Sequence, residues 1–303
     1  MVVSNQTCAI VVTFNRVDLL KECIQALNAQ TEPVSHIIVI NNKSTDNTEE
    51  YLRKLNEKLS NLIVVNSKRN LGGAGGFNLG LKSAYDLTSD DYFWLLDDDT
   101  IVEENANKNF TKHSVQLQNQ YGFLISNVRW IDGTPANVMN TAQDWPALSN
   151  QGLIKVNYGS FVSFFVQRRS VSLVGYPITD FFIWGDDAEF SLRLRSLNDG
   201  YFMEDVMATH KSASKDVAAG VAYDSENRID RYFYSYRNQL YIWKTYFPKK
   251  YKGVLIRKLL KSFSILFISN NHRIYRFKVA VSGIIHSVFF NPIVEKANKY
   301  TKK

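Results

Sequence analysis

The chain has 303 residues, 45% of them hydrophobic, so it can bury a full core and is too apolar to be disordered. Its only cysteines, Cys8 and Cys23, lie in an apolar run and a helical pattern, which argues against a disulfide framework and favours a reducing compartment. Residues 244–303 contain 14 Lys and Arg against Glu295 alone, a net charge of +13 within a total of +7, so residues 1–243 carry −6. No basic flank or cleavage site precedes the first apolar run, and we expect a cytoplasmic protein.

The first hundred residues alternate between strand and helix patterns. Apolar runs predict strands at 8–14, 36–40, 61–65 and 92–96. Helical spacing predicts helices at 17–29, at 45–58, and from a glycine-rich stretch through Tyr85. This alternation is typical of an α/β fold with a mostly parallel sheet, which binds ligands at the carboxyl ends of its strands.

The pattern is less regular beyond residue 121. Strand-like pieces occur at 123–126 and 159–167, and helices are predicted at 187–195 and 231–243. We place a boundary near Lys215, which separates a catalytic domain, residues 1–215, from a basic helical region, residues 216–303.

Three consecutive aspartates, Asp97, Asp98 and Asp99, follow the fourth predicted strand. Adjacent carboxylates repel one another, so a chain that gathers them at a strand end usually binds a divalent cation or protonates one of them. An acidic turn or helix cap leading into Thr100 explains the same residues equally well when they are taken alone.

Two other strand ends carry polar segments. Thr13, Phe14, Asn15 and Arg16 follow the first strand, where Phe14 could flank a nucleotide base and Arg16 could pair with phosphate. Asn42, after the second strand, offers both a donor and an acceptor to the edge of a base. A capped helix start and a polar turn are the alternative interpretations.

The glycine-rich segment NLGGAGG begins at Asn70, next to Arg69. It lacks the Gly-Lys-Ser/Thr of a Walker sequence and the spacing of the dinucleotide fingerprint. Glycines such as Gly72 and Gly73 permit close backbone approach to a ligand and present amide donors at a helix start. A flexible turn is the alternative.

A second acidic cluster lies in the segment FFIWGDDAEF, where Asp186, Asp187 and Glu189 follow Trp184. Large aromatic neighbours can desolvate a carboxylate, which raises its pKa and makes it a competent general base. Helix capping is the alternative for these residues. His210 follows a short apolar run and could face a metal, although a lone histidine is more often a packed or surface residue.

Together these segments resemble the inverting glycosyltransferases of family 2, which have the GT-A (Rossmann-like) nucleotide-sugar-binding fold, over about residues 8–243. The segments GGAGGF and FFIWGDDAEF and residues 234–238 are most similar to bacterial galactofuranosyltransferases, with rhamnosyltransferases close behind. Asn41 stands where many relatives carry Asp.

The resemblance implies a site with two halves. Asp97 and Asp99 would bind Mn²⁺ or Mg²⁺ with His210 as a further ligand, and Asp187 would act as the base. Asp186 and Glu189 would bind or orient the acceptor, and Arg237 is a further candidate for phosphate or acceptor contacts. The implied contacts to the nucleotide-sugar donor are Thr13, Phe14, Asn15, Arg16, Asn42, Arg69, Asn70, Gly72, Gly73, Asp97, Asp98 and Trp184.

The implied reaction transfers galactofuranose from UDP-galactofuranose to a lipid-linked or polysaccharide acceptor, with a dTDP-rhamnose-dependent enzyme as the alternative. A sugar nucleotidyltransferase would carry glycines in the first strand-to-helix loop, and TFNR, which begins at Thr13, has none. A non-catalytic sugar-nucleotide or membrane-binding module is a third alternative, and the intact acidic residues speak against it.

The basic C-terminal region contains two apolar stretches, at 255–267 and 279–290. Both are shorter than the roughly 18 residues that cross a bilayer. We expect interfacial helices at an anionic membrane surface, on the inner face of the cell membrane. An ordinary helical subdomain with a solvated basic face is the alternative, and nucleic acid is not expected because no aromatic-basic reading motif accompanies the charge.

Overall fold

The structure, a computed structural model, describes residues 6–211 and 220–297. Within them, nine strands form one sheet in the order β3-β2-β1-β4-β8-β6-β9-β5, with β7 paired to β9. The strands are β1 (Thr7–Thr13), β2 (His36–Asn41), β3 (Leu62–Asn66), β4 (Tyr92–Asp97), β5 (Thr100–Val102), β6 (Phe123–Trp130), β7 (Leu153–Val156), β8 (Ser163–Gln167) and β9 (Gly200–His210).

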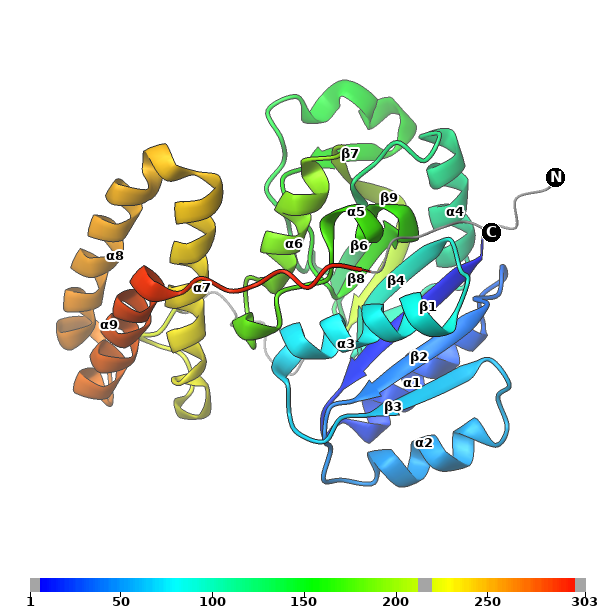
Figure 1. Cartoon of the computed structure of the whole chain (residues 1–303), viewed down its shortest axis with the longest axis horizontal. Helices are drawn as coiled ribbons and strands as arrows, with labels where there is room; N and C mark the ends of the chain where they lie inside the picture. The colour runs from blue at the N-terminus through cyan, green and yellow to red at the C-terminus, as the bar shows by residue number, and fades with distance from the viewer. Residues whose placement is uncertain (1–5, 212–219, 298–303) are drawn as a thin grey trace.

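Helices cover both faces of the sheet, and three more form a bundle beside it (Figure 1). The α-helices are α1 (Val17–Asn28), α2 (Thr48–Asn56), α3 (Gly72–Leu87), α4 (Ala106–Gln116), α5 (Arg168–Val174), α6 (Asp186–Arg195), α7 (Arg231–Tyr246), α8 (Pro248–Ile268) and α9 (Arg273–Phe289). Short 3-10 helices are η1 (Trp145–Gln151), η2 (Thr179–Phe181) and η4 (Glu226–Arg228).

The predicted sheet is confirmed. Strands β1, β2, β3, β4, β6 and β9 share one direction, and β5, β7 and β8 run against them. The first four strands form the parallel half that the sequence predicts. Strands β5 and β7 were not predicted, because three or four residues are too few to show a period.

Two corrections concern strand lengths. The predicted strand 159–167 begins only at Ser163. The short apolar run before His210 is the end of an eleven-residue strand, β9. Its exposed Glu204 and Asp205 interrupt the apolar pattern where the pairing of β6 with β9 shifts register, so the sequence displays only the last part of the strand.

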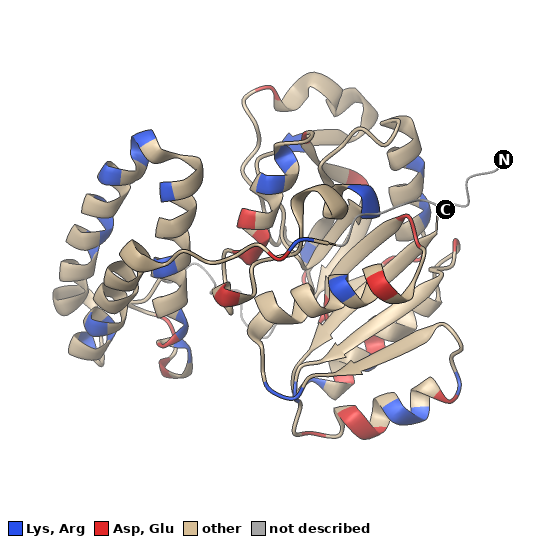
Figure 2. Ribbon diagram, in the orientation of Figure 1, with Lys and Arg blue, Asp and Glu red and all other residues tan. Residues whose placement is uncertain are grey.

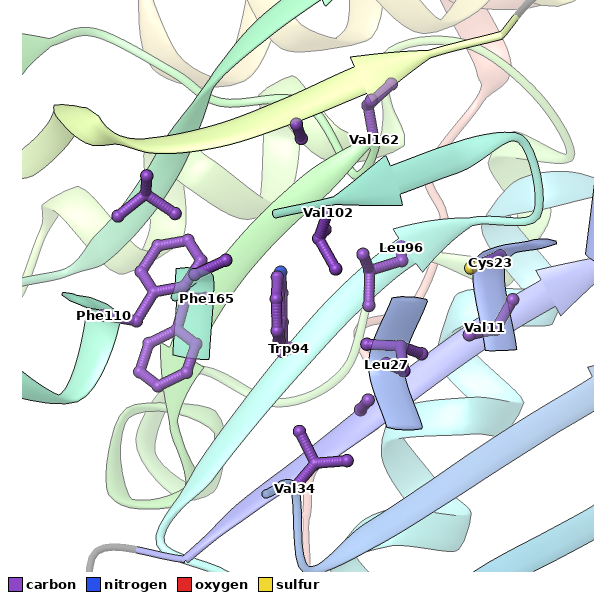
Figure 3. Packing of buried hydrophobic residues seen from close by; sticks show 14 of the residues in the cluster. Val11, Cys23, Leu27, Val34, Trp94, Leu96, Val102, Phe110, Val162 and Phe165 are labelled. Atoms are coloured by element: carbon purple, nitrogen blue, oxygen red, sulfur yellow. The ribbon is translucent and has the colours of Figure 1, made fainter. Parts of the chain in front are cut away.

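The core lies in two layers, one on each face of the sheet. Alternate residues of β1 separate to opposite faces: Val11 packs with α1, α2 and α4, and Ile10 packs with α3, α5 and α6. Figure 3 shows the first layer, where Trp94 lies between Leu96 and the stacked rings of Phe110 and Phe165, whose centroids are 4.6 Å apart.

Helix α3 approaches the second face of the sheet closely because of its glycines. A Cβ added to Gly76 would lie 2.5 Å from Val12 Cγ1, and one added to Gly80 would lie 2.4 Å from Ile10 Cγ2. Gly76 and Gly80 therefore let α3 pack closely on the sheet, which fixes where the start of α3 lies relative to the ends of β1 and β2.

Helices α7, α8 and α9 form the separate bundle, and the chain then returns along the part of the molecule that contains the sheet (Figure 1). In the returning segment, the Glu295 carbonyl accepts from Tyr176 N at 2.9 Å, and Ala297 joins the second core layer. The predicted boundary near Lys215 lies outside the described residues. None of the described helices is long and apolar enough to cross a membrane.

Candidate active site

The ends of β1 and β4 lie side by side, and Asp98 joins them. Its Oδ2 accepts from Thr13 Oγ1 at 2.8 Å and from Phe14 N at 3.4 Å. Arg16 reaches across, with its Nη1 3.3 Å from Asp98 Oδ1 and 2.6 Å from Asp99 Oδ2. Burial raises the pKa of Asp98 to about 6, and the charge of Arg16 opposes that rise. In this structure Asp98 therefore shapes the loop after β1.

Three of the predicted residues form a candidate metal site. Asp97, Asp99 and His210 offer ligand atoms that all lie within 4.8 Å of one another. Strand β5 brings them together, because Thr100 pairs in register with His210 at the end of β9. Asp99 Oδ1 is buried without a hydrogen-bond partner of good geometry, although His210 Nε2 is 3.2 Å away.

The surroundings of His210 fix its orientation. Its Nδ1 lies 3.1 Å from Asn137 Oδ1, and Trp130 stacks on the ring with centroids 5.1 Å apart. When Nδ1 donates to Asn137, the Nε2 lone pair faces the two carboxylates, which is the usual arrangement of a metal-ligating histidine. Two carboxylates and one imidazole suit Mn²⁺ or Mg²⁺, so the residues fit the predicted ion.

The neighbouring carboxylates of Asp97 and Asp99 repel one another, and this repulsion affects their pKa values. Burial, and then the charge of Asp99, raise the pKa of Asp97 to about 7. Burial also opposes ionisation of Asp99, but the nearby imidazole of His210 lowers its pKa below the ordinary value. Burial lowers the pKa of His210, and contact with Asp99 more than reverses this. A bound cation would relieve the repulsion between Asp97 and Asp99.

Asn42 is engaged within the protein. Its side chain is only 2% exposed, and both ends of the amide are engaged. Nδ2 donates to the Gly72 carbonyl at 3.0 Å and to Asn70 Oδ1 at 3.2 Å, and Oδ1 accepts from Leu71 N at 2.8 Å. In this structure Asn42 anchors the start of α3, and the expected contact to a base edge stays a prediction.

Asn15 links two loops. Its φ is +55°, its N donates to Ser44 Oγ at 3.0 Å, and its Oδ1 accepts from Thr45 N at 2.6 Å. The loops after β1 and β2 are thereby joined into one surface. Phe14, 42% exposed, and the exposed Arg69 remain available to a ligand on that surface.

Gly72 is required by a protein contact. Its φ is +70°, and an added Cβ would lie 2.0 Å from the Phe182 carbonyl, which also accepts from Ala74 N at 3.1 Å. The start of α3 therefore rests on the turn that precedes the second acidic cluster. Gly73 has open space around its Cβ position. Of Gly72 and Gly73, the two glycines predicted to contact the donor, only Gly73 has no described atom, apart from its chain neighbours and its own helix backbone, within 4 Å of the position of an added Cβ.

The turn before α6 has an unusual backbone. Phe182, Trp184 and Gly185 all have positive φ, at +62°, +64° and +90°. Asn238 on α7 is fully buried, and its Nδ2 donates to the carbonyls of Phe181 at 2.9 Å, Ile183 at 3.2 Å and Trp184 at 2.8 Å. The sequence-level resemblance included Asn238 without its role, which is to fix this turn.

Asp186 and Asp187 open α6, one residue earlier than predicted. Asp187 Oδ1 accepts from Ala188 N at 2.7 Å, and burial raises its pKa to about 6. Burial raises the pKa of Asp186 well above its ordinary value, and the charges of Asp187 and Asp97 add to the shift. The charge of Asp97 contributes to this shift, so the two acidic clusters influence one another electrostatically.

Two residues predicted to contact substrates also make contacts within the protein. Glu189 is fully buried: both of its oxygens accept from Arg193 Nε, at 2.8 and 3.0 Å, and Oε1 also accepts from Tyr246 at 2.6 Å. With both oxygens engaged, it positions α6 against α7. Trp184, expected at the donor, packs edge to face on Tyr232 with centroids 5.1 Å apart.

Arg237 is likewise used within the protein. Its guanidinium donates to the Asp180 carbonyl and to Asn238 Oδ1, and it lies 3.9 Å from the Phe290 ring centroid. The expected contact with phosphate or acceptor is replaced by a role in orienting Asn238.

A pocket of about 640 Å³ adjoins Asp187. The sequence did not predict it, because its wall combines α6 and α7 with residues near 140 and 157, from an irregular segment. Its lining includes Asn140, Tyr158, Arg195, Gln239, Trp243 and Phe247.

Residues 8–151 match the sequence model of Glycosyl transferase family 2. Galactofuranosyltransferase GlfT1 of Mycolicibacterium smegmatis is 39% identical over 92 residues, 30% of this chain and 29% of that protein. Poly-beta-1,6-N-acetyl-D-glucosamine synthase of Staphylococcus aureus is 30% identical over 200 residues, 62% of this chain and 46% of that protein. The chain thus spans less than half the length of either relative.

Two solved structures share the fold. GalNAc-T7 with UDP, GalNAc and Mn²⁺ has a TM-score of 0.67 at 13% identity, covering 90% of this chain and 53% of that one. S. aureus TarS 1-349 in complex with UDP-GlcNAc has a TM-score of 0.54 at 14% identity, covering 94% and 72%. These neighbours identify the α/β architecture as the GT-A fold, as predicted.

Proposed function

The chain carries a glycosyl transferase family 2 domain, and on that premise we propose that it is an inverting, divalent-metal-dependent glycosyltransferase. The proposed donor is UDP-galactofuranose, because the relatives include a galactofuranosyltransferase and a solved neighbour contains UDP-GlcNAc. The proposed acceptor is a lipid-linked or polysaccharide glycan in cell-surface glycan synthesis. The observation that carries the proposal is the cluster of Asp97, Asp99 and His210, suited to a cation, in the same domain as Asp186 and Asp187 at the start of α6.

In this mechanism the donor diphosphate lies at the ends of β1 and β4. Asp97, Asp99 and His210 are the proposed metal ligands, and Mn²⁺ or Mg²⁺ bound there would neutralise the departing diphosphate. Arg16 is exposed beside them and adds a positive charge. The open backbone at Gly73 is available to the donor at the start of α3.

Asp187 is the proposed base. It takes the proton of an acceptor hydroxyl while that oxygen forms a bond to the anomeric carbon. The bond between that carbon and the β-phosphate oxygen breaks at the same time, and UDP leaves with the electron pair. Attack opposite the leaving group inverts the anomeric centre. Asp186, whose pKa is raised further, is the proposed proton-bearing neighbour that orients Asp187.

A donor panel tests this proposal. Purified protein is incubated with Mn²⁺ and either UDP-galactofuranose or dTDP-rhamnose, and the released nucleotide is measured with and without a chelator. We expect UDP release from UDP-galactofuranose that the chelator abolishes. Release from dTDP-rhamnose alone would identify a rhamnosyltransferase, and release that survives chelation would refute the metal-dependent mechanism.

We also propose that the C-terminal bundle binds the anionic inner face of the membrane. On α8, Ile256, Leu260, Phe263 and Phe267 are 55% to 79% exposed and are spaced by three or four residues, so they form one outward stripe. Exposed basic residues accompany it: Lys249 and Lys252 precede the stripe, and Arg257 and Lys261 flank it. Figure 2 shows the same excess of Lys and Arg along the bundle. An apolar stripe bordered by basic residues suits anionic headgroups over acyl chains.

A further inference from the structure

The pocket beside Asp187 is distinct from the donor half of the site. None of the donor and metal residues from β1, β4 or β9 lines it, whereas Asp187 lies in its wall. Its volume of about 640 Å³ is within the range of small-molecule sites. A ligand in this pocket would therefore reach the proposed base without occupying the donor residues.

The lining has the chemistry of a sugar-binding surface. Trp243 and Phe247, on α7 and at its end, lie with ring centroids 5.0 Å apart, and Phe247 is 38% exposed. Amide groups come from Asn140, Asn157 and Gln239. A sugar ring presents C–H groups on its faces and hydroxyls around its edge, so it needs both aromatic surface and amide partners.

The charges in the lining favour a neutral ligand. Asp187 is the acidic residue and Arg195 the basic residue among those that line the pocket. Arg195 is partly committed, since its Nη1 donates to Asn157 Oδ1 at 3.0 Å. This leaves no cationic cluster for a diphosphate, which separates the pocket from the donor site with its Arg16.

We propose that this pocket binds the acceptor sugar, with Trp243 and Phe247 against one face of its ring and a hydroxyl directed at Asp187. This inference rests on the proposed glycosyltransferase function and adds the acceptor site to it. It also gives the C-terminal bundle a direct part in substrate recognition, because α7 supplies the aromatic wall.

Binding can be measured without the donor sugar. Saturation-transfer difference NMR is recorded for octyl glycosides of galactofuranose, galactopyranose and rhamnose with the protein, UDP and Mn²⁺. We expect saturation of ring protons for at least one glycoside. Trp243→Ala should weaken that binding about tenfold, as for loss of an aromatic contact, and Trp243→Tyr should restore most of it. Trp145→Ala, at a 41% exposed tryptophan of η1 outside the pocket, is the matched control and should bind as the wild type does.

Transfer to the same glycosides gives the second readout. Trp243→Ala should raise the KM for the acceptor about tenfold, whereas Trp145→Ala should leave that KM within about twofold of the wild type. Unchanged binding and KM in Trp243→Ala, or no saturation from any glycoside, would overturn the acceptor site. Absence of UDP release with intact glycoside binding would instead refute the proposed donor.

Discussion

The two acidic clusters of the site differ in their charged neighbours. Burial raises the pKa of Asp97 to about 7 and that of Asp98 to about 6, and the charges of His210 and Arg16 oppose these rises. Burial also opposes ionisation of Asp99, but His210 and Arg16 lower its pKa. Burial raises the pKa of Asp186 and Asp187, and no described cationic side chain is among the main causes of either shift. A cluster that already faces cationic groups suits a metal ion, whereas a carboxylate with a raised pKa and no cationic partner suits proton transfer near neutral pH. The same residue type thus serves two functions through its surroundings.

The two halves are also built differently. The donor half comes from consecutive strand-helix units, whose strand ends meet at one edge of the sheet. The acceptor half depends on contacts between distant segments, such as Asn238 with the carbonyls at 181, 183 and 184. Substitutions in the two halves should therefore fail in different ways.

The largest effect is expected at Asp187. Asp187→Asn removes the proposed base, so transfer should fall by about 10²- to 10⁴-fold. The fall in transfer is measured as the rate of UDP release in the presence of acceptor. Asp180→Asn, at an exposed neighbouring carboxylate, is the control and should keep the wild-type rate. Wild-type transfer by Asp187→Asn would assign proton removal to another group.

Asn238→Ala should give the next largest effect. It leaves three carbonyls without their donor, and the turn before Asp186 loses its fixed backbone. We expect kcat to fall at least about tenfold, and the free energy of unfolding to fall by about 1–3 kcal/mol. Asn28→Ala, at an exposed site on α1, is the control. A lower Tm with unchanged kcat would reduce Asn238 to a purely structural residue.

The pH dependence should separate the two clusters. Because the pKa of Asp187 is raised to about 6 and the base acts in its charged form, transfer should rise with pH through about 6 and level off above it. With saturating Mn²⁺, the residual activity of Asp187→Asn should lose this acid limb. If Asp187→Asn shows the same rise in activity through pH 6, that rise would be assigned to the metal cluster instead of Asp187.

The smallest effect on turnover is expected from the outward stripe of α8. The triple change Leu260→Gln, Phe263→Gln and Phe267→Gln should reduce flotation with phosphatidylglycerol vesicles at least about tenfold. Release of UDP with soluble substrates should stay within about twofold. Ile131→Gln with Leu173→Gln, at exposed apolar sites outside the bundle, is the control. Equal flotation of both variants would refute the membrane proposal.

Sequence alone predicted the parallel strands and the residues at their ends, because strand ends in an α/β sheet meet regardless of side-chain detail. The resemblance to family 2 glycosyltransferases grouped Asp97, Asp99 and His210, and the structure brings their ligand atoms together. The sequence did not predict the hydrogen-bond partners of Asn42 and Glu189, since a motif gives the residue but not its partners within the protein. Asn42 is engaged by the backbone near Gly72, and Glu189 by Arg193 and Tyr246.

The aromatic wall of the pocket was beyond sequence reasoning for another reason. Trp243 follows the helical pattern of α7, which is equally consistent with simple packing. Its position beside Asp187 depends on how α7 docks on the turn before α6. That docking comes from Asn238 and from the contact of Tyr246 with Glu189, which are tertiary interactions without a local pattern.

The central claim is that one acidic cluster binds metal and nucleotide while the other transfers the proton. Calorimetric titration of UDP in the presence of Mn²⁺ tests it most directly, on the wild type, Asp99→Asn and Asp187→Asn. We predict that Asp99→Asn weakens UDP binding at least about tenfold. Asp187→Asn should bind UDP within about twofold of the wild type. Equal loss of affinity in both variants, or none in Asp99→Asn, would contradict the division of the site.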